Sequence, residues 1–189
     1  MAVDTDAIQT FLAEARRIVA ETPDDAKKLE RLTPLMQRLA ATPGVLAPEQ
    51  MRCESTERAT RHTLHETPDH SLALWAVVWP TGYSTLPHNH HTWAIVVGVR
   101  GAETNTFWQR VDDGSQPGRA EVRQNGVVTM RQGDVVTMVG SDIHSVANHE
   151  PEPSVSIHFY GQNPDTLPRE QFDPATGEVR PVKGRVGRL

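Results

Sequence analysis

The stretch GYSTLPHNH, residues 82–90, carries two histidines one residue apart, His88 and His90. A second stretch, GDVVTMVGSDIHSVAN, residues 133–148, carries a third histidine, His144. Side chains alternate between the faces of an extended strand, so His88 and His90 are expected on one side, about two strand rises (~6.6 Å) apart. One cation can bridge that separation, and the turn before His144 can return a second strand beside the first. The two stretches therefore predict a metal site of three histidines in a β-barrel.

Length, charge and cysteine content narrow the class of protein. The 189 residues suffice for one barrel domain with extensions. A net charge of -5 and a pI near 6.0 give no basic stripe with interleaved aromatic residues, so no nucleic acid partner is expected. Cys53 is the only cysteine, which excludes an intrachain disulfide and fits a reducing cytosol. Without a leader-like N-terminus or a membrane-sized apolar run, we expect a cytoplasmic monomer or homodimer with no membrane contact.

The first fifty residues have helical periodicity. The sequence TPDD at 22–25 combines an N-cap, a proline at the first helical position and acidic residues in the first turn. Thr33-Pro34 repeats this start signal and predicts a further helix start there. Between about Thr5 and Ala20, apolar residues at steps of three and four predict one buried stripe of Ile8, Phe11, Leu12, Ala15 and Val19.

After these helices the pattern becomes that of short strands. Strand-like segments between turn residues cover 72–79, 93–99, 103–110, 121–123, 127–131, 135–139 and 154–160. Many short, closely spaced strands indicate an antiparallel barrel or sandwich. We therefore expect a mainly β fold, with an N-terminal helical segment over 1–52 packing on a barrel over 53–165, and a C-terminal extension over 166–189. A basic and solvated tail is expected there, formed by Arg180, Lys183, Arg185 and Arg188.

Chance pairing has to be weighed, because the chain has nine histidines and a short motif predicts a site only when its context agrees. Here the context agrees. The stretch 82–90, Gly101 after the next strand and the stretch 133–148 resemble, in order, both halves of the double motif of the cupins. This resemblance implies a single cupin barrel, a double-stranded β-helix of the jelly-roll type. The glutamate that usually follows the second histidine is absent, and Ala94 and Ile95 stand there.

Glu103 is the acidic residue that could replace this missing glutamate as a displaced ligand. It lies beyond Gly101 on the far side of a turn. This position favours a carboxylate that does not bind the metal, and that is either solvated or in contact with a metal-binding residue. Two histidines with one carboxylate are the usual set of non-haem Fe(II) oxygenases. A neutral imidazole in place of the carboxylate makes the centre one charge unit more positive. Such a centre favours an anionic substrate ligand, for which a thiolate is a natural candidate.

Ser156, His158 and Tyr160 alternate with apolar residues in the segment PSVSIHFYG. In a strand they project from one face, so the apolar set is expected to pack against the helices and the polar set to line the barrel. Such a line can relay hydrogen bonds, with the histidine orienting the phenol toward the metal. The alternative is a polar edge facing solvent. Four tryptophans are expected to be barrel packing: Trp75, Trp79, Trp93 and Trp108.

At these residues the chain resembles the thiol dioxygenases, the cysteine dioxygenase family of cupins, and most of all their bacterial 3-mercaptopropionate branch. The resemblance runs from about Thr60 to Arg169 and rests on the segments TRHTLH, PHNHHTW, GVRGAE, DIHSVAN and SIHFY. It implies Fe(II) bound by the three histidines, a small thiol carboxylate bound through its thiolate, and addition of both atoms of O2 to sulfur to give a sulfinic acid.

The resemblance also implies roles for the tyrosine line and for an arginine. Ser156, His158 and Tyr160 correspond to the residues that act beside the metal. Tyr160 is expected to be unmodified, because the crosslinking cysteine of the animal enzymes falls on or near Ala94. The planar fork of an arginine suits the substrate carboxylate. Arg61 lies close to where the cysteine-specific enzymes keep this arginine, and Arg169, which we favour, lies where the 3-mercaptopropionate enzymes keep theirs.

Other functions stay open at this point. The thiol is 3-mercaptopropionate-like in our interpretation, with cysteine and mercaptosuccinate as alternatives. A dioxygenase for a non-thiol substrate, or a cupin that uses nickel or manganese, is a second possibility. A different class is a non-catalytic metal-binding cupin that senses a ligand, because fold alone does not decide function.

Overall fold

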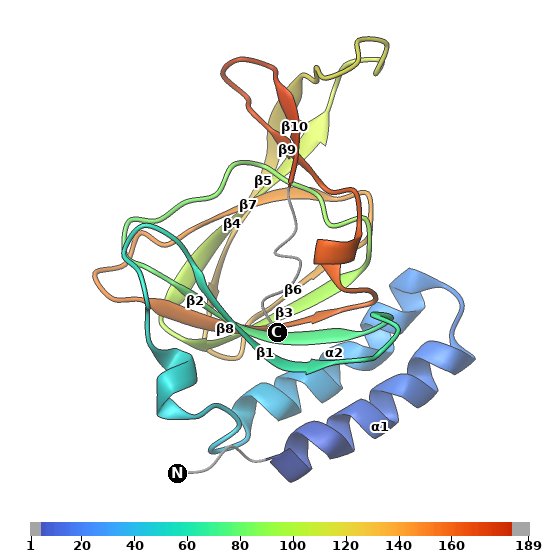
Figure 1. Ribbon diagram of the computed structural model, residues 1–189, viewed down its shortest axis with the longest axis vertical. Helices are drawn as coiled ribbons and strands as arrows, with labels where there is room; N and C mark the ends of the chain where they lie inside the picture. Colours follow the sequence, from blue (N-terminus) through green and yellow to red (C-terminus); the bar gives the residue numbers. More distant parts are fainter. Residues whose placement is uncertain (1–4, 183–189) are drawn as a thin grey trace.

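The computed structural model describes residues 5–182. Two antiparallel sheets face each other, two N-terminal helices lie on the outside of one of them, and a third sheet is a two-stranded hairpin (Figure 1). In chain order the elements are α1 (Thr5–Glu21), α2 (Asp25–Ala41), the 3-10 helix η1 (Pro48–Met51), β1 (Thr60–Glu66), β2 (Ala73–Trp79), β3 (Ala94–Arg100), β4 (Ala102–Arg110), β5 (Val122–Arg131), β6 (Val135–Met138), β7 (Ile143–Ala147), β8 (Ser154–Tyr160), the 3-10 helix η2 (Pro164–Thr166), β9 (Glu170–Phe172) and β10 (Val179–Pro181).

The helices follow the apolar stripes, with three corrections. In α1 the stripe is completed by Ile18, which is buried, whereas Val19 is only partly buried. The α2 helix begins after Asp24, whose carboxylate accepts a hydrogen bond from the amide of Lys27, so the predicted start with Pro23 as first helical residue was wrong. The helix also runs through Pro34 without a new start. The predicted second start was wrong because the buried stripe of α2 continues on both sides of the proline. Packing of that stripe offsets the one backbone hydrogen bond that a proline removes. The buried residues of α2 are Leu29, Leu32, Leu35, Met36 and Leu39.

The strand order is that of a jelly roll. One sheet has the order β1-β2-β8-β3-β6 and the other β5-β4-β7. The segment 84–88 lies beside β7 through isolated bridges from Ser84 to Ala147 and from His88 to His144. We count eight strands from β2 to β8, with the segment 84–88 as the second and without the extra edge strand β1. The larger sheet then has the order first-eighth-third-sixth, and the smaller sheet has the order second-seventh-fourth-fifth. This order closes two Greek keys and confirms the predicted barrel class.

Three differences from the predicted strands have physical reasons. The segments 121–123 and 127–131 form one strand, β5, because the chain passes Gly126 with a shift of register instead of a turn. The edge strand β1 was not predicted, since its sequence TRHTLHE is polar and half exposed. The short hairpin of β9 and β10 was not predicted either. It packs beside the β4–β5 loop, where the backbones of Arg119 and Glu178 form an isolated β-bridge (Figure 1).

The five-stranded sheet is buried on both faces, which explains the continuous apolar run of β2. Its outer face packs against α1 and α2 and contributes Leu74, Ile95, Ile157 and Phe159 among others. Its inner face contributes a second cluster that contains Trp75, Val77, Trp79, Val96 and Tyr160. The barrel interior is therefore lined by aromatic and small apolar residues around the polar groups described below.

The predicted basic tail lies mostly outside the described residues, since Lys183, Arg185 and Arg188 follow residue 182. Arg180 belongs to β10, is exposed and pairs with Glu178 at 2.6 Å. Within the described part of the chain, neither helix is long and apolar enough to span a membrane.

Candidate metal centre

Three histidines from two neighbouring segments of the barrel meet in its interior. His88 and His144 exchange both backbone hydrogen bonds, at 2.8 and 3.0 Å between nitrogen and oxygen. His90 follows in an irregular turn that ends at His91, whose φ of 54° lies in the left-handed region. The expected regular strand through His88 and His90 is therefore absent, but the two rings still converge, with centroids 5.0 Å apart. The potential ligand atoms of His88, His90 and His144 all lie within 4.8 Å of one another.

The hydrogen bonds of these rings leave nitrogen lone pairs directed at a common point. The Nδ1–H of His88 donates to the carbonyl of Leu86 at 3.0 Å, and the Nδ1–H of His144 donates to Oδ1 of Asn105 at 3.1 Å. Each ring therefore keeps a bare Nε2. The Nε2 atoms of His90 and His144 lie 3.0 Å apart, and the buried Nδ1 of His90 has no hydrogen-bond partner among the described residues. Two lone pairs at this distance need a proton or a cation between them.

Burial keeps the three imidazoles neutral. It is the largest cause that lowers the pKa of His88 to about 4 and the pKa of His90 and His144 well below the usual value. The charge of Arg169 lowers the pKa of His88 further, and repulsion from neighbouring histidine rings does so for His90 and His144. Neutral imidazole is the form that binds a metal ion. Two nitrogens bound to one ion at ~2.1 Å and at right angles lie ~3 Å apart, which matches the His90–His144 separation. The three residues thus fit a metal ion.

A hydrogen-bonded line runs along the inner face of β8 toward this centre. Tyr160 OH lies 2.9 Å from Nδ1 of His158, and Nε2 of His158 lies 2.9 Å from Oγ of Ser156. All three side chains are buried, so the structure has the inward-facing arrangement and not a solvent-facing edge. The ring of Tyr160 lies 5.2 Å from the ring of His90, measured between centroids. Burial raises the pKa of the Tyr160 phenol and lowers that of His158 to about 3.

Glu103 ends this line and also connects it to a histidine of the centre. Ser156 Oγ donates to its Oε2 at 2.8 Å, and Nδ2 of Asn105 approaches its Oε1 at 3.4 Å. Because Asn105 also accepts from His144, the contacts run from a metal-binding ring to the carboxylate and on to Tyr160. Within the described residues Glu103 is not part of the ligand cluster, and at 3% exposure it is not solvated either. Of the two alternatives expected for Glu103, the solvated carboxylate was wrong; the residue instead reaches His144 through Asn105.

The protonation state of Glu103 sets the direction of the line. Burial raises its pKa to about 7, and hydrogen bonds from Ser156 and Asn105 oppose this rise. When Glu103 is ionised, each hydroxyl or N–H must donate toward it, so Tyr160 donates to His158. When Glu103 carries a proton, every donor can reverse, and the phenol proton of Tyr160 becomes free to point into the centre.

Both arginines singled out from the sequence lie near the centre, and they meet on one carboxylate. Arg61 Nη1 lies 2.6 Å from Oδ2 of Asp165, and Arg169 Nη2 lies 2.7 Å from Oδ1 of the same residue. Asp165 was missed in the sequence, although Asn163-Pro164-Asp165 carries the signal of a helix start with an acid in its first turn. Asn105 was also missed, and its strand parity with Glu103 could have indicated it.

No family model matches the chain. Among solved structures, the chain is similar to a cupin superfamily protein from Desulfitobacterium hafniense, at 14% identity and a TM-score of 0.44, with 60% of this chain and 87% of that chain covered. It is also similar to a cupin-like protein from Thermotoga maritima, at 21% identity and a TM-score of 0.45, with 64% and 80% covered. A third similar structure is KdgF from Halomonas sp., at 22% identity and a TM-score of 0.41, with 58% and 84% covered. The assignment of the barrel rests on the strand order given above.

Proposed function

We propose that this protein is a non-haem Fe(II) thiol dioxygenase. It adds both atoms of O2 to the sulfur of a small thiol carboxylate, so that a thiol and O2 give a sulfinic acid with no further reductant. The observation that carries the proposal is a buried centre of three neutral imidazoles with no carboxylate among them, beside a hydrogen-bonded tyrosine. The resemblance to the cysteine dioxygenase family in the same segments supports it.

The donor set accounts for an anionic substrate. His88, His90 and His144 would hold the iron and contribute no negative charge. When bound, Fe(II) would bind the thiolate and activate O2, and so bring the two reactants together. Buried apolar residues of the inner face, among them Trp75 and Val96, line this region of the barrel.

The residues beside the centre would position protons and the substrate. Tyr160 is oriented by His158 and Ser156, and its ring lies next to the ring of His90. It can donate a hydrogen bond toward the reacting oxygen while Glu103 is protonated. Arg169, with Arg61 beside it, would bind the substrate carboxylate, since a guanidinium fork matches a carboxylate in geometry and charge. A 3-mercaptopropionate-like thiol remains the preferred substrate, with cysteine and mercaptosuccinate as alternatives.

A panel of thiols tests the function. Iron-loaded protein is mixed with 3-mercaptopropionate, cysteine, mercaptosuccinate and cysteamine, and O2 uptake and sulfinate formation are measured. We expect equal amounts of O2 consumed and sulfinate formed with at least one carboxylated thiol, and neither with metal-free protein. If the iron-loaded protein binds the thiols without consuming O2, the non-catalytic ligand sensor replaces this proposal. Metal analysis of protein purified without added metal distinguishes iron from nickel or manganese.

A further inference from the structure

Arg61 and Arg169 reach Asp165 from two separate elements. Arg61 comes from β1, and Arg169 follows η2, the short helix that contains Asp165. The Nε of Arg169 also donates to the carbonyl of Pro164 at 2.8 Å. A guanidinium has five N–H donors, and these bonds engage two nitrogens of Arg169 and one of Arg61. Both arginines therefore keep N–H groups that a second acceptor can use.

This group of two arginines and one carboxylate lies at the side of the three-histidine centre. Arg61 pairs with Val77 of β2, so its side chain is on the inner face of the sheet. Its guanidinium carbon lies 4.1 Å from the centre of the Trp75 ring, which is 4.8 Å from the ring of Tyr160. After burial and the neighbouring rings, the charge of Arg169 is a further cause of the lowered pKa of His90.

A buried donor without a partner points to a missing ligand in the same place. The indole Nε1–H of Trp75 is buried, at 5% exposure for the residue, and has no acceptor among the described residues. Buried donors are otherwise almost always paired, because an unpaired one costs about 1–3 kcal/mol. The ring of Trp75 lies under the guanidinium of Arg61, so this unpaired donor belongs to a side chain that contacts the pair of arginines.

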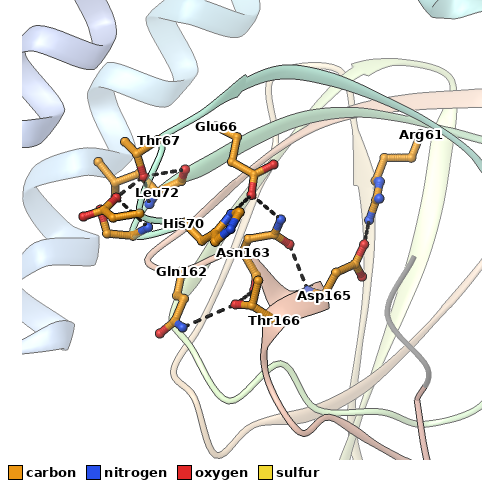
Figure 2. A network of polar contacts seen from close by, with 11 residues as sticks. Arg61, Glu66, Thr67, His70, Leu72, Gln162, Asn163, Asp165 and Thr166 are labelled. Atoms are coloured by element: carbon orange, nitrogen blue, oxygen red, sulfur yellow. Dashed lines mark hydrogen bonds and ion pairs between the residues drawn. The ribbon is translucent and has the colours of Figure 1, made fainter. Parts of the chain in front are cut away.

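The position of Asp165 is fixed by its surroundings. Its backbone amide donates to Oδ1 of Asn163 at 2.9 Å, and Nδ2 of Asn163 donates to Glu66 of β1 at 2.6 Å (Figure 2). Asn163 is tied further by its amide, which donates to the carbonyl of His70 at 2.8 Å. The side chain of Asp165 is only 6% exposed. The carboxylate is therefore held between the two arginines before any substrate arrives.

We propose that Asp165 is a specificity-determining residue, which restricts the site to thiols that carry a single carboxylate. The two guanidinium groups and the one carboxylate leave one formal positive charge, and one substrate carboxylate neutralises it. A second carboxylate would bring an uncompensated negative charge into a partly buried site beside Asp165, where charges interact more strongly than in water. This inference rests on the proposed function, since it assigns a substrate class to the same site.

Asp165→Asn tests the inference, because it removes the charge and keeps the shape of the side chain. The kcat/KM ratio of 3-mercaptopropionate to mercaptosuccinate is measured by O2 uptake with iron-loaded protein. We expect the ratio to fall at least about tenfold, through KM and not kcat, since one charge-assisted hydrogen bond corresponds to about 10–100-fold in affinity. Asp165→Glu keeps the charge and should stay close to the parent ratio. An unchanged ratio in a folded Asp165→Asn protein would overturn the inference.

A matched control exists on the outside of the molecule. Glu21 of α1 also lies between two arginines, at 2.8 Å from Arg17 and 3.2 Å from Arg31, but it is exposed. Glu21→Gln makes the same change in net charge and should leave the ratio unmoved. If Asp165→Asn does not fold, Arg61→Gln supplies the opposite change: it lowers the local charge to zero and should disfavour mercaptosuccinate more than 3-mercaptopropionate. An equal loss for both thiols would contradict the role of charge.

Binding of thiol-free acids separates the two proposals. Titration calorimetry with propionate and succinate measures charge selectivity without any oxidation. If no thiol is oxidised but Asp165→Asn increases the affinity for succinate relative to that for propionate, the proposed function fails and the role of Asp165 stands. If thiols are oxidised but both proteins bind the two acids in the same ratio, the function stands and the role of Asp165 fails.

Discussion

The two faces of β8 are equally buried, yet they carry opposite chemistry. On the outer face Val155, Ile157 and Phe159 pack against the helices, and on the inner face Ser156, His158 and Tyr160 form a hydrogen-bonded line. The outer face gains its free energy from apolar burial, whereas each polar group of the inner face needs a partner to offset its desolvation. We infer that changes to the outer face alter stability, and that changes to the inner face alter the chemistry of the site.

The largest expected effect is the loss of bound iron and of activity when a histidine on the inner side of the barrel is removed. His144→Ala should reduce bound iron from about one per chain to nearly none and abolish activity, because two imidazoles remain of the three. Metal analysis of the purified variant measures this. His149→Ala, which changes an exposed histidine five residues away, is the control and should keep its iron. Near-stoichiometric iron in His144→Ala would remove His144 as a ligand.

Phe159→Ala, on the outer face of β8, should lower stability and leave the metal centre unchanged. Phe159 is fully buried, and its ring centroid lies 5.0 Å from that of Phe11 and 5.4 Å from that of Trp93. Loss of the ring should lower the free energy of unfolding by about 3–5 kcal/mol. Urea unfolding measures this loss, and iron content and KM of the folded variant should stay at the parent values. A large change in KM would show that the two faces are not independent.

Removal of the arginines should change substrate binding and not iron content. Arg169→Ala should raise KM for mercaptoacids about 10–100-fold, as expected for a charge-assisted pair, and Arg61→Ala should raise it less. Arg169 is the more buried of the two, with 12% of its side chain exposed against 22% for Arg61. Steady-state kinetics on both variants gives the comparison. A larger effect of Arg61→Ala would favour a cysteine-type site.

The smallest effect, taken per pH unit, is the change of stability with pH, and it separates the faces once more. The pKa of Glu103 is raised to about 7 in the folded chain, against an ordinary value of 4.5. Between these values the folded chain holds a proton that the unfolded chain has released, so the contribution of Glu103 to stability falls as pH rises from about 4.5 to 7. The slope is at most ~1.4 kcal/mol per pH unit. Glu103→Gln should lack this contribution, whereas Phe159→Ala should keep it, as measured by urea unfolding at several pH values.

The sequence was sufficient for features that depend on local pattern. Alternation in PSVSIHFYG predicted the two faces of β8, because strand parity follows from neighbours in the chain. The three histidines of the centre were also predicted, but His90 reaches it from an irregular turn and not through the parity of a regular strand. It was insufficient where a contact joins distant residues. Arg61 and Asp165 are separated by 104 positions, and nothing local marks them as partners. The burial of Glu103 likewise depends on Ser156 of another strand.

The pairing of His88 with His144 makes the centre depend on a closed barrel. His90 and His144 are 54 positions apart, so their rings meet only when the segment 84–88 has docked beside β7 and the barrel has closed. An ion bound by these rings is a cross-link between segments with a high contact order, and it favours the closed barrel by mass action. The ion that would serve the chemistry would thus also stabilise the closed barrel.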